Sequence, residues 1–465
     1  MEIIILMKHE LMLALMLALL LVVRISADSE NINTIRLFNC LFLINCIVGW
    51  FGNGEGILFS GMFMNSPLLA FEKNILNTGT LLICLSSSGW LQKQRHLPEF
   101  YMLMISALLG MFLMVSSSNL LMFYLAIEMS AIPIAALCNF NHDERRSSEA
   151  AMKMIFSSAF SSCIMLLGIS FLYGASGSLD YSEISIAGYS SLLIIGFVFF
   201  FSGIVFKLSV VPFHFWTADV YEGSPIAVTS FLSVISKGAM VFVLHQILFR
   251  VFHNLESSWY LLVCVLSILT MITGNLFAIR QQNMKRFLAF SSITQVGFIL
   301  IGISGSSHDA LSSSVYFIVI YIFSNLAAFA VVSQISERTG KETISDYKGL
   351  AATNPVMAWT LAIALFSLAG IPPTAGFFGK IFLLTSGAAR GNYWLISIAA
   401  LNMMVSLYYY LRVIRSMFMD TGGSIETMQT GNSYKVAMIV CIAGILIVGF
   451  VGSFYDYIYS MGQNL

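Results

Sequence analysis

The stretch PIAVTSFLSVISKGAMVFVLHQILFR, residues 225–250, decides the fold. It is long enough to cross a bilayer as one helix, and Lys237 lies at its centre. About 12 residues separate Lys237 from each end, so its ammonium group lies roughly 18 Å from either membrane surface. A lysine stem spans only about 6 Å, which is too short to reach the surface from that depth. An ionisable group at the membrane midplane typically marks an ion or proton path.

The composition of the whole chain is that of an integral membrane protein. Of its 465 residues, 58% are hydrophobic and 10% are charged, against about 25% charged in a soluble domain. Basic and acidic residues are equal in number, 23 each, so no charge excess indicates nucleic-acid binding. The seven cysteines form no CxxC pair, the histidines form no HxxxH or ExxH pattern, and GxGxxG and GxxxxGK(S/T) motifs are absent. The sequence therefore predicts no metal, iron–sulfur, flavin or nucleotide site in this chain.

Apolar runs of membrane-spanning length recur along the chain with short polar breaks. They predict a single all-α membrane domain, residues 1–465, of about 14 helices. The predicted spans are 4–23, 37–57, 67–88, 99–116, 119–138, 150–174, 188–211, 225–249, 258–279, 286–304, 310–335, 355–383, 392–417 and 435–460. The first apolar run also fits the core of a signal peptide, so the residues alone leave two interpretations of it open.

The basic residues between the spans predict how the chain is oriented. With both termini on the outer face, nearly all loop lysines and arginines lie on the inner face, as the positive-inside rule requires. Lys207, Lys237 and Lys380 fall inside helices. The basic residues outside, or near the outer ends of helices, are Lys8, Lys73, Arg250 and Arg390. This asymmetry supports an even number of spans.

Two predicted helices contain proline breaks. The seventh runs through KLSVVPFHFW (207–216), and the twelfth contains GIPPTAGFFGK (370–380). Proline removes a backbone donor, and at membrane depth such a break persists only where the freed groups face protein or water. The breaks lie five helices apart, and FKLSVVP (206–212) shares Phe, Leu and Pro with FSLAGIP (366–372). This predicts two inverted five-helix repeats, helices 4–8 (99–250) and 9–13 (258–418), between a three-helix segment (1–98) and a C-terminal helix (435–465).

Four ionisable residues inside these helices predict a proton relay. Glu128 lies half-way along the fifth span and is the predicted partner of Lys207, and Lys237 and Lys380 lie farther along the path. A charge gained or lost at one buried site alters the next, because electrostatic interactions are strong at low dielectric. The alternative is a structural ion pair that fixes the packing of the helices.

Other polar residues in these helices are candidates for a hydrated path, each with a simple interhelical hydrogen bond as the alternative. They are His245, Ser233, Ser236, Ser291, Ser292, Gln295, Tyr316, Tyr321 and Asn325. His245 lies two turns beyond Lys237 toward the outer face and fits an exit. A second group follows the break in the seventh helix and forms either a proton inlet or an ordered loop. Its members are His214, Trp216, Asp219 and Glu222.

The run KLSVVPFHFWTADVYEGSPIAVTSFLSVISKG (207–238) closely resembles the antiporter-like membrane subunits of respiratory complex I. Its ending, FLSVISK, resembles subunit N of NADH-quinone oxidoreductase, the counterpart of mitochondrial subunit 2. Sister subunits L and M and related Na⁺/H⁺ antiporter subunits typically read PFHxWLPxAHxxAPxPxSxxLxxxxxK there. The runs QQNMKRFLAFSSITQVGF (281–298) and GIPPTAGFFGKIFLL (370–384) are similar to the same family. Here Asp219-Val220-Tyr221 stands where the sister subunits carry Ala-His, and Ala218 stands where the family often has proline.

The resemblance implies a retained first helix and two inverted half-channels, with Glu128, Lys207, Lys237 and Lys380 as the relay. It implies proton translocation coupled to redox chemistry in partner subunits, which would hold NADH, FMN, the iron–sulfur clusters and quinone. The expected neighbours are subunit M-like and subunit K-like chains and lipid. The expected location is the bacterial inner (plasma) membrane, with the mitochondrial inner membrane as the alternative. A cation/proton antiporter and a membrane scaffold with vestigial charges are the alternative functions.

Overall fold

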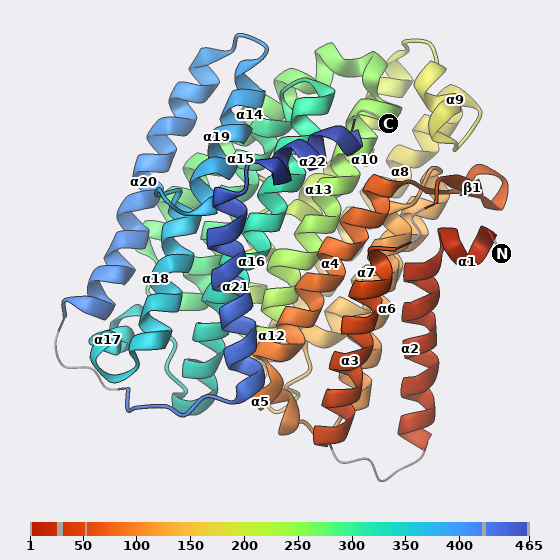
Figure 1. The fold of residues 1–465 in the computed structure, drawn as a ribbon. Coiled ribbons are helices and arrows are strands. Elements are labelled where there is room, and N and C mark those ends of the chain that lie inside the picture. Colours follow the sequence, from red (N-terminus) through yellow and green to blue (C-terminus); the bar gives the residue numbers. More distant parts are fainter. Residues whose placement is uncertain (1, 26–30, 52–53, 421–424, 463–465) are drawn as a thin grey trace.

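The helices of the computed structural model run side by side between two faces of one bundle (Figure 1). The structure describes residues 2–25, 31–51, 54–420 and 425–462. The N- and C-terminal ends lie in the upper half of this view, as do β1 (Gly56–Leu58) and α9 (Tyr181–Ile186). The short helices α5 (Ser88–Gln92) and α17 (Leu350–Thr353) lie near the lower face. The lower face therefore corresponds to the basic, predicted inner side.

The elements of the first half are α1 (Glu2–Leu6), α2 (Lys8–Ile25), α3 (Asn31–Gly49), η1 (Phe59–Gly61), β2 (Phe63–Asn65), α4 (Pro67–Ser86), α6 (Leu97–Val115), α7 (Leu120–Cys138), α8 (Arg145–Ser176), α10 (Ser191–Leu208), α11 (Phe215–Gly223), α12 (Ile226–Ser230), η2 (Phe231–Ser236), α13 (Lys237–Gln246) and η3 (Ile247–Val251). Those of the second half are η4 (His253–Leu255), α14 (Glu256–Arg280), α15 (Met284–Ile303), α16 (Ser307–Thr339), η5 (Ile344–Tyr347), α18 (Pro355–Ala369), α19 (Ala375–Ala388), α20 (Tyr393–Phe418), α21 (Asn432–Phe450) and α22 (Ser453–Gly462).

The predicted all-α membrane fold is confirmed. Within the described residues, 12 helices are long and apolar enough to cross a membrane. They match all the predicted spans except the first and the twelfth. The first corresponds to α2, and the twelfth is divided into the shorter helices α18 and α19, as its prolines predict.

Two predicted spans are wrong at their ends. The second, 37–57, stops at Gly49, and residues 56–65 instead form the antiparallel hairpin of β1 and β2. The backbone of this segment bonds to the turn between α6 and α7, where Met64 N–H donates to the carbonyl of Ser116 over 2.9 Å. The last span, 435–460, stops at Phe450, and α22 then runs across α16 and α4 (Figure 1).

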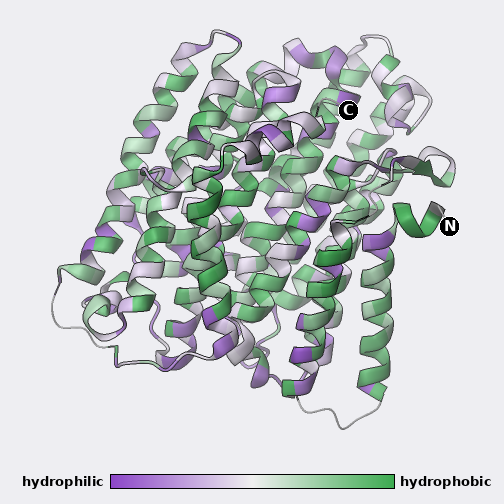
Figure 2. Cartoon of the chain, viewed as in Figure 1, coloured by the Kyte–Doolittle hydropathy of each residue, from purple (hydrophilic) through white to green (hydrophobic). Residues whose placement is uncertain are grey.

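The core of the bundle contains the three long helical stretches Ile226–Val251, Met284–Ile303 and Ser307–Thr339, in each of which 94% of the residues of an apolar 18-residue segment are buried. In the peripheral helix α21 this share is only 28%, and Figure 2 shows that α21, like most of the bundle, is largely hydrophobic. Apolar outer faces suit lipid or membrane neighbours. Polar side chains on the three core stretches are shielded from lipid and must find partners inside the protein.

Candidate functional site

Lys237 lies in the core, at the point where π-helical η2 passes into α13. Its side chain is 2% exposed, and its Nζ donates to Ser292 Oγ on α15 over 2.7 Å. The ammonium group also lies 5.5 Å from the centre of the Tyr221 ring. A π-helical turn is wider than an α-helical one and often occurs at functional sites. The buried amine is therefore held by a hydroxyl and an aromatic face, which are neutral partners.

A second polar group lies one turn before Lys237. Ser233 shares a hydrogen bond of 3.1 Å with the Tyr321 hydroxyl and accepts one of 2.8 Å from Asn325 Nδ2. Tyr321 and Asn325 are both on α16, one turn apart. Three of the predicted path residues, Ser233, Tyr321 and Asn325, thus join η2, directly before Lys237, to α16.

A chain of hydrogen bonds leads from the neighbour of Ser292 to Lys380. Ser291 shares a hydrogen bond of 2.5 Å with the Tyr410 hydroxyl, which accepts another from Gln295 Nε2 over 3.1 Å. Gln295 Nε2 also donates to the carbonyl of Leu368 over 3.0 Å. Lys380 Nζ donates to that same carbonyl over 2.7 Å. The chain therefore connects α15, α20, α18 and α19 through polar atoms inside the bundle.

Lys380 is held by the end of a broken helix. α18 stops at Ala369 because Gly370 takes the left-handed conformation, φ 84°, and Pro372 and Pro373 follow. The last carbonyls of a helix lack intrahelical partners and carry partial negative charge. Lys380 binds the carbonyl of Ala369 over 3.1 Å as well as that of Leu368, and its ammonium lies 4.6 Å from the Phe298 ring centre.

Glu128 and Lys207 each bind a serine of α8. Lys207 Nζ donates to Ser158 Oγ over 2.8 Å, and the Ser162 hydroxyl donates to a carboxylate oxygen of Glu128. Ser158 and Ser162 are four residues apart and therefore lie on one face of α8. The structure places the predicted pair beside the same helix but not in a direct ion pair.

Lys207 lies in the last turn of α10, just before the other break. Ser209 takes the left-handed conformation, φ 64°, and Pro212 follows. The freed carbonyl of Phe206 accepts a hydrogen bond of 3.2 Å from Trp216 Nε1. His214, in the turn between α10 and α11, is buried, and its Nδ1 has no hydrogen-bond partner among the described residues.

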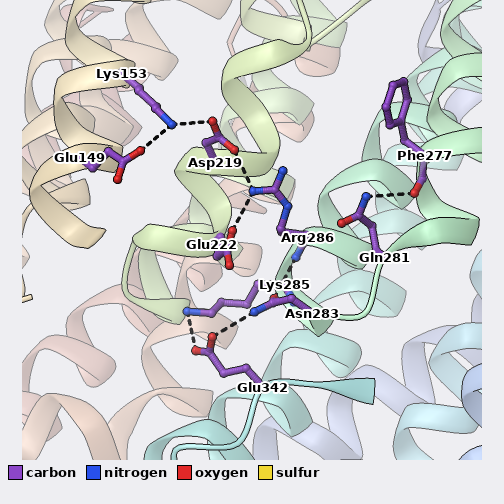
Figure 3. Close-up of polar contacts among 10 residues, drawn as sticks. All are labelled: Glu149, Lys153, Asp219, Glu222, Phe277, Gln281, Asn283, Lys285, Arg286 and Glu342. Carbon is purple, nitrogen blue, oxygen red and sulfur yellow. Dashed lines mark hydrogen bonds and ion pairs between the residues drawn. The ribbon is translucent and has the colours of Figure 1, made fainter. Parts of the chain in front are cut away.

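A charged network covers the inner end of this region (Figure 3). Lys153 of α8 binds Glu149 over 2.7 Å and Asp219 of α11 over 2.6 Å. Arg286 of α15 binds the other oxygen of Asp219 over 2.8 Å and Glu222 over 2.7 Å. Burial alone would raise the pKa of Asp219, but the hydrogen bonds from Lys153 and Arg286 lower it below its ordinary value. The network joins three elements around a cavity of about 170 Å³.

A second ion pair lies beside this network in Figure 3. Lys285 binds Glu342 over 2.7 Å, and Asn283 donates to Glu342 over 3.2 Å. Both contacts join the start of α15 to the segment after α16. They lie outside the chain of polar contacts between Lys237 and Lys380.

Two other predicted path residues lie apart from that chain. Tyr316 donates to the carbonyl of Val448 on α21 over 3.0 Å. His245 Nε2 binds the carbonyl of Ser307 over 2.9 Å at the outer end of the bundle. Sequence reasoning missed Ser158, Ser162 and Tyr410. The spacing of the two serines on one helix face was an available signal, whereas nothing in the sequence distinguishes Tyr410 from its tyrosine neighbours.

Among the described residues, no cluster of three or more His, Cys, Asp or Glu side chains could hold a metal ion. The site is thus built from amines, hydroxyls, amides and backbone carbonyls. The amines bind and release protons, hydroxyls pass protons along hydrogen bonds, and amides and carbonyls hold these groups in place.

Known proteins share both the sequence and the fold of this chain. The family described as NADH:quinone oxidoreductase/Mrp antiporter, TM, matches residues 117–406. NADH-quinone oxidoreductase subunit N of Azobacteroides pseudotrichonymphae genomovar. CFP2 is 45% identical over 410 residues, covering 87% of this chain and 85% of the relative. Subunit N of Phocaeicola vulgatus is 41% identical over 457 residues, covering 97% of each chain.

A solved structure agrees with these relatives. A chain of respiratory complex I from Thermus thermophilus with bound aureothin has a TM-score of 0.83 and 25% identity, covering 96% of this chain and 97% of that chain. The resemblance carried by residues 207–238, 281–298 and 370–384 is therefore confirmed. The chain belongs to the antiporter-like, proton-translocating subunit N family of NADH-quinone oxidoreductase, whose members are integral membrane subunits that work with the other subunits of complex I.

Proposed function

We propose that this chain translocates protons through a relay of Glu128, Lys207, Lys237 and Lys380, driven by NADH oxidation and quinone reduction in partner subunits. The observation that carries the proposal is that polar contacts lead from each of the two central amines to adjacent residues of α15. Lys237 binds Ser292, and the adjacent Ser291 begins the hydrogen-bonded chain that ends at Lys380.

The first step of the relay is a switch at Glu128 and Lys207. The separated arrangement, in which each residue binds a serine of α8, represents its open state. In this state the positive charge of Lys207 is not neutralised by Glu128 and acts on Lys237 through a medium of low dielectric. Closing the pair would remove that effect. The two serines, one turn apart, give each side chain a neutral partner while the pair is open.

The second step is proton transfer from Lys237 toward Lys380. The Tyr410 hydroxyl both donates and accepts hydrogen bonds, so it fits a proton-conducting chain with local water, and Gln295 donates to it and positions it. Lys380 suits the acceptor role because the carbonyl end of α18 stabilises its charged form. When Lys207 is charged and unpaired, its positive charge repels a proton on Lys237. The electrostatic energy therefore falls when that proton moves away from Lys207.

The inner charged network is the proposed inlet. Its cavity of about 170 Å³ is lined by polar side chains at the inner ends of α8, α11 and α15. Charged residues around a narrow opening hold water and concentrate ions near it. His214, at the break between the network and Lys207, supplies a titratable group on that route.

The finer organisation follows from the same proposal. Residues 99–250 and 258–418 form two inverted half-channels with one broken helix each, flanked by the N-terminal segment 1–98 and the C-terminal residues 435–465. The expected neighbours are subunit M-like and subunit K-like chains in a bacterial inner membrane. The similar ends of α10 and α18, each with a left-handed residue before a proline, support the repeat.

The test is Lys237→Ala in the assembled complex, in sealed membrane vesicles. We expect both proton pumping and NADH:quinone reductase activity to fall at least about tenfold, because a blocked relay stops the reaction that drives it. The matched control is Lys348→Ala, which removes an exposed lysine of an inner loop. Unchanged pumping by Lys237→Ala at normal assembly contradicts the relay. Activity that depends on sodium favours cation antiport instead.

A further inference from the structure

A buried carboxylate outside the relay lies near the outer face of the bundle. Glu72, in the second turn of α4, is 2% exposed. Its Oε2 has no hydrogen-bond partner among the described residues. A buried carboxylate without a partner is costly, so proteins keep such groups mainly where they bind a ligand or a proton.

The neighbouring lysine does not serve as the partner of Glu72. Lys73 is fully buried and binds Glu10 of α2, with 2.5 Å between Nζ and Oε1. Lys73 Nζ also donates to Asn65 Oδ1 over 3.4 Å and lies 5.0 Å from the centre of the Phe63 ring. The charge of Lys73 is thus compensated on the side of α2 and the hairpin.

Glu72 instead lines a cavity of about 230 Å³. This outer cavity is bounded by α4, α13, η3, α16 and the end of α22, and its polar lining residues are Glu72, His245, Gln246, Arg250, Ser307 and His308. Arg250 and His308 are exposed, whereas Glu72 and His245 are buried. A cavity of this size holds several waters. It therefore links buried titratable groups to the surface predicted to be the outer one.

His245 lines the outer cavity and belongs to the helical stretch that carries Lys237. It lies eight residues after Lys237 in one continuous helical stretch, which is about 12 Å along the helix axis. Its Nε2 binds the carbonyl of Ser307, and a carbonyl can only accept, so this nitrogen carries hydrogen. In the neutral ring the lone pair is then on Nδ1, which is free to take a proton.

We propose that Glu72 is a proton-carrying residue of the known reaction, at the outer end of the path. A proton on His245 Nδ1 passes to the Glu72 carboxylate through cavity water, breaking an N–H bond and forming an O–H bond. Glu72 then releases the proton to water at the mouth beside Arg250 and His308. No electrons are transferred in either step. This inference rests on the proposed relay, since it assigns an outlet on the outer side of Lys237, one of the relay lysines.

The experiment compares Glu72→Gln and Glu72→Asp in the assembled complex, in sealed vesicles. Glutamine keeps the size of the side chain but cannot carry a proton, whereas aspartate keeps the carboxyl group. We expect Glu72→Gln to lower pumping and quinone reduction per assembled complex about tenfold, and Glu72→Asp to retain most of both. The matched control is Glu183→Gln, which changes an exposed carboxylate of α9 on the same face.

Each other outcome has one meaning. Normal pumping in Glu72→Gln overturns the inference but leaves the relay intact, provided that Lys237→Ala still blocks pumping. Equal losses in Glu72→Gln and Glu72→Asp, or loss of the assembled complex in either, assign Glu72 to packing and also overturn it. Normal pumping in Lys237→Ala contradicts the relay itself, whatever Glu72→Gln does.

Discussion

The three lysines of the proposed relay share one feature at the scale of single residues: each buried amine is bound by neutral oxygens. Lys207 and Lys237 donate to serine hydroxyls, and Lys380 donates to backbone carbonyls. A tightly bound carboxylate would hold a proton on each amine and stop transfer, whereas a neutral oxygen supports both the charged and the neutral form. This choice of partner suits groups that must gain and lose a proton in every cycle.

Tyr410→Phe tests the chain between Lys237 and Lys380. The change removes one hydroxyl and leaves Ser291 and Gln295 without their shared partner. We expect pumping and quinone reductase activity to fall several-fold, at a stability cost of about 1–3 kcal/mol. The matched control is Tyr181→Phe, because Tyr181 is buried, shares a hydrogen bond of 3.1 Å with Ser117 and lies outside the chain. Equal activities in the two variants would exclude Tyr410 from the path.

Sequence reasoning singled out the lysines and the Lys237 partner Ser292, but not Ser158, Ser162 or Tyr410. Charged residues are rare in apolar runs, so the sequence alone draws attention to each one. Lys237 and Lys380 are predicted from their positions in such runs. Serines and tyrosines are ordinary in membrane helices. The roles of Ser158 and Tyr410 depend on which way each helix face points, and this requires the packed structure.

At the scale of elements, the two broken helices present their lysines differently. In α10 the lysine precedes the break and lies on the half-helix that ends there. In the second broken helix, formed by α18 and α19, Lys380 follows the break. It lies on α19 and its side chain extends back to the C-terminal end of α18. At the second break the amine contacts backbone carbonyls at the open end of α18, whereas Lys207 at the first break binds a serine of α8. The break therefore supplies polar groups at membrane depth.

Gly370→Ala tests the geometry of the second break. The new Cβ would lie 2.9 Å from Lys380 Cδ, so the flexible lysine stem must move and draw its ammonium away from Leu368. The positive φ adds a cost of about 1–2 kcal/mol. Gly391→Ala is the matched control, with φ 77° but no described atom within 4 Å of the new Cβ. We expect similar losses of stability but a loss of pumping only in Gly370→Ala. A drop of the same size in both variants would mean that backbone strain alone is responsible.

The elements that sequence reasoning misplaced lie at the membrane surface. The predicted spans continue through residues 50–57 and 451–460, yet the helices end at Gly49 and at Phe450. In the first case the backbone pairs with a distant turn, and in the second the helix is redirected across α16 and α4. Inside the membrane, intrahelical bonding is nearly obligatory, and prediction succeeds. At the surface other partners compete for the backbone.

At the scale of the whole molecule, the inner charged network joins parts that are far apart in the sequence. Asp219 bridges Lys153 of the first proposed repeat and Arg286 of the second, and it does so from the short helix after the first break (Figure 3). A shift of α11 would alter all of these contacts together. The network is therefore suited to hold the proposed inlet in a fixed position relative to both halves of the bundle.

Asp219→Asn tests how much the inner charged network stabilises the protein. The pH dependence of this stabilisation has a definite sign. Asp219 has a lowered pKa in the folded protein, so its stabilising effect is fully present above the unfolded value of about 3.9 and is lost only as the pH falls through the lower, folded value. We expect a stability loss of about 1 kcal/mol, because the side chain is partly exposed. It should be constant between about pH 6 and pH 9, since the carboxylate stays ionised there.

The measurement is the temperature at which the detergent-solubilised complex loses half of its quinone reductase activity, taken across that pH range. Asp143→Asn, which changes an exposed aspartate of an inner loop, is the control and should leave this temperature unchanged. If the stability loss caused by Asp219→Asn became smaller between about pH 7 and pH 6, another group with a pKa near neutrality would control the strength of the network. A constant effect, reduced by salt because these charges are partly exposed, is the behaviour of an ion network that holds α8, α11 and α15 together.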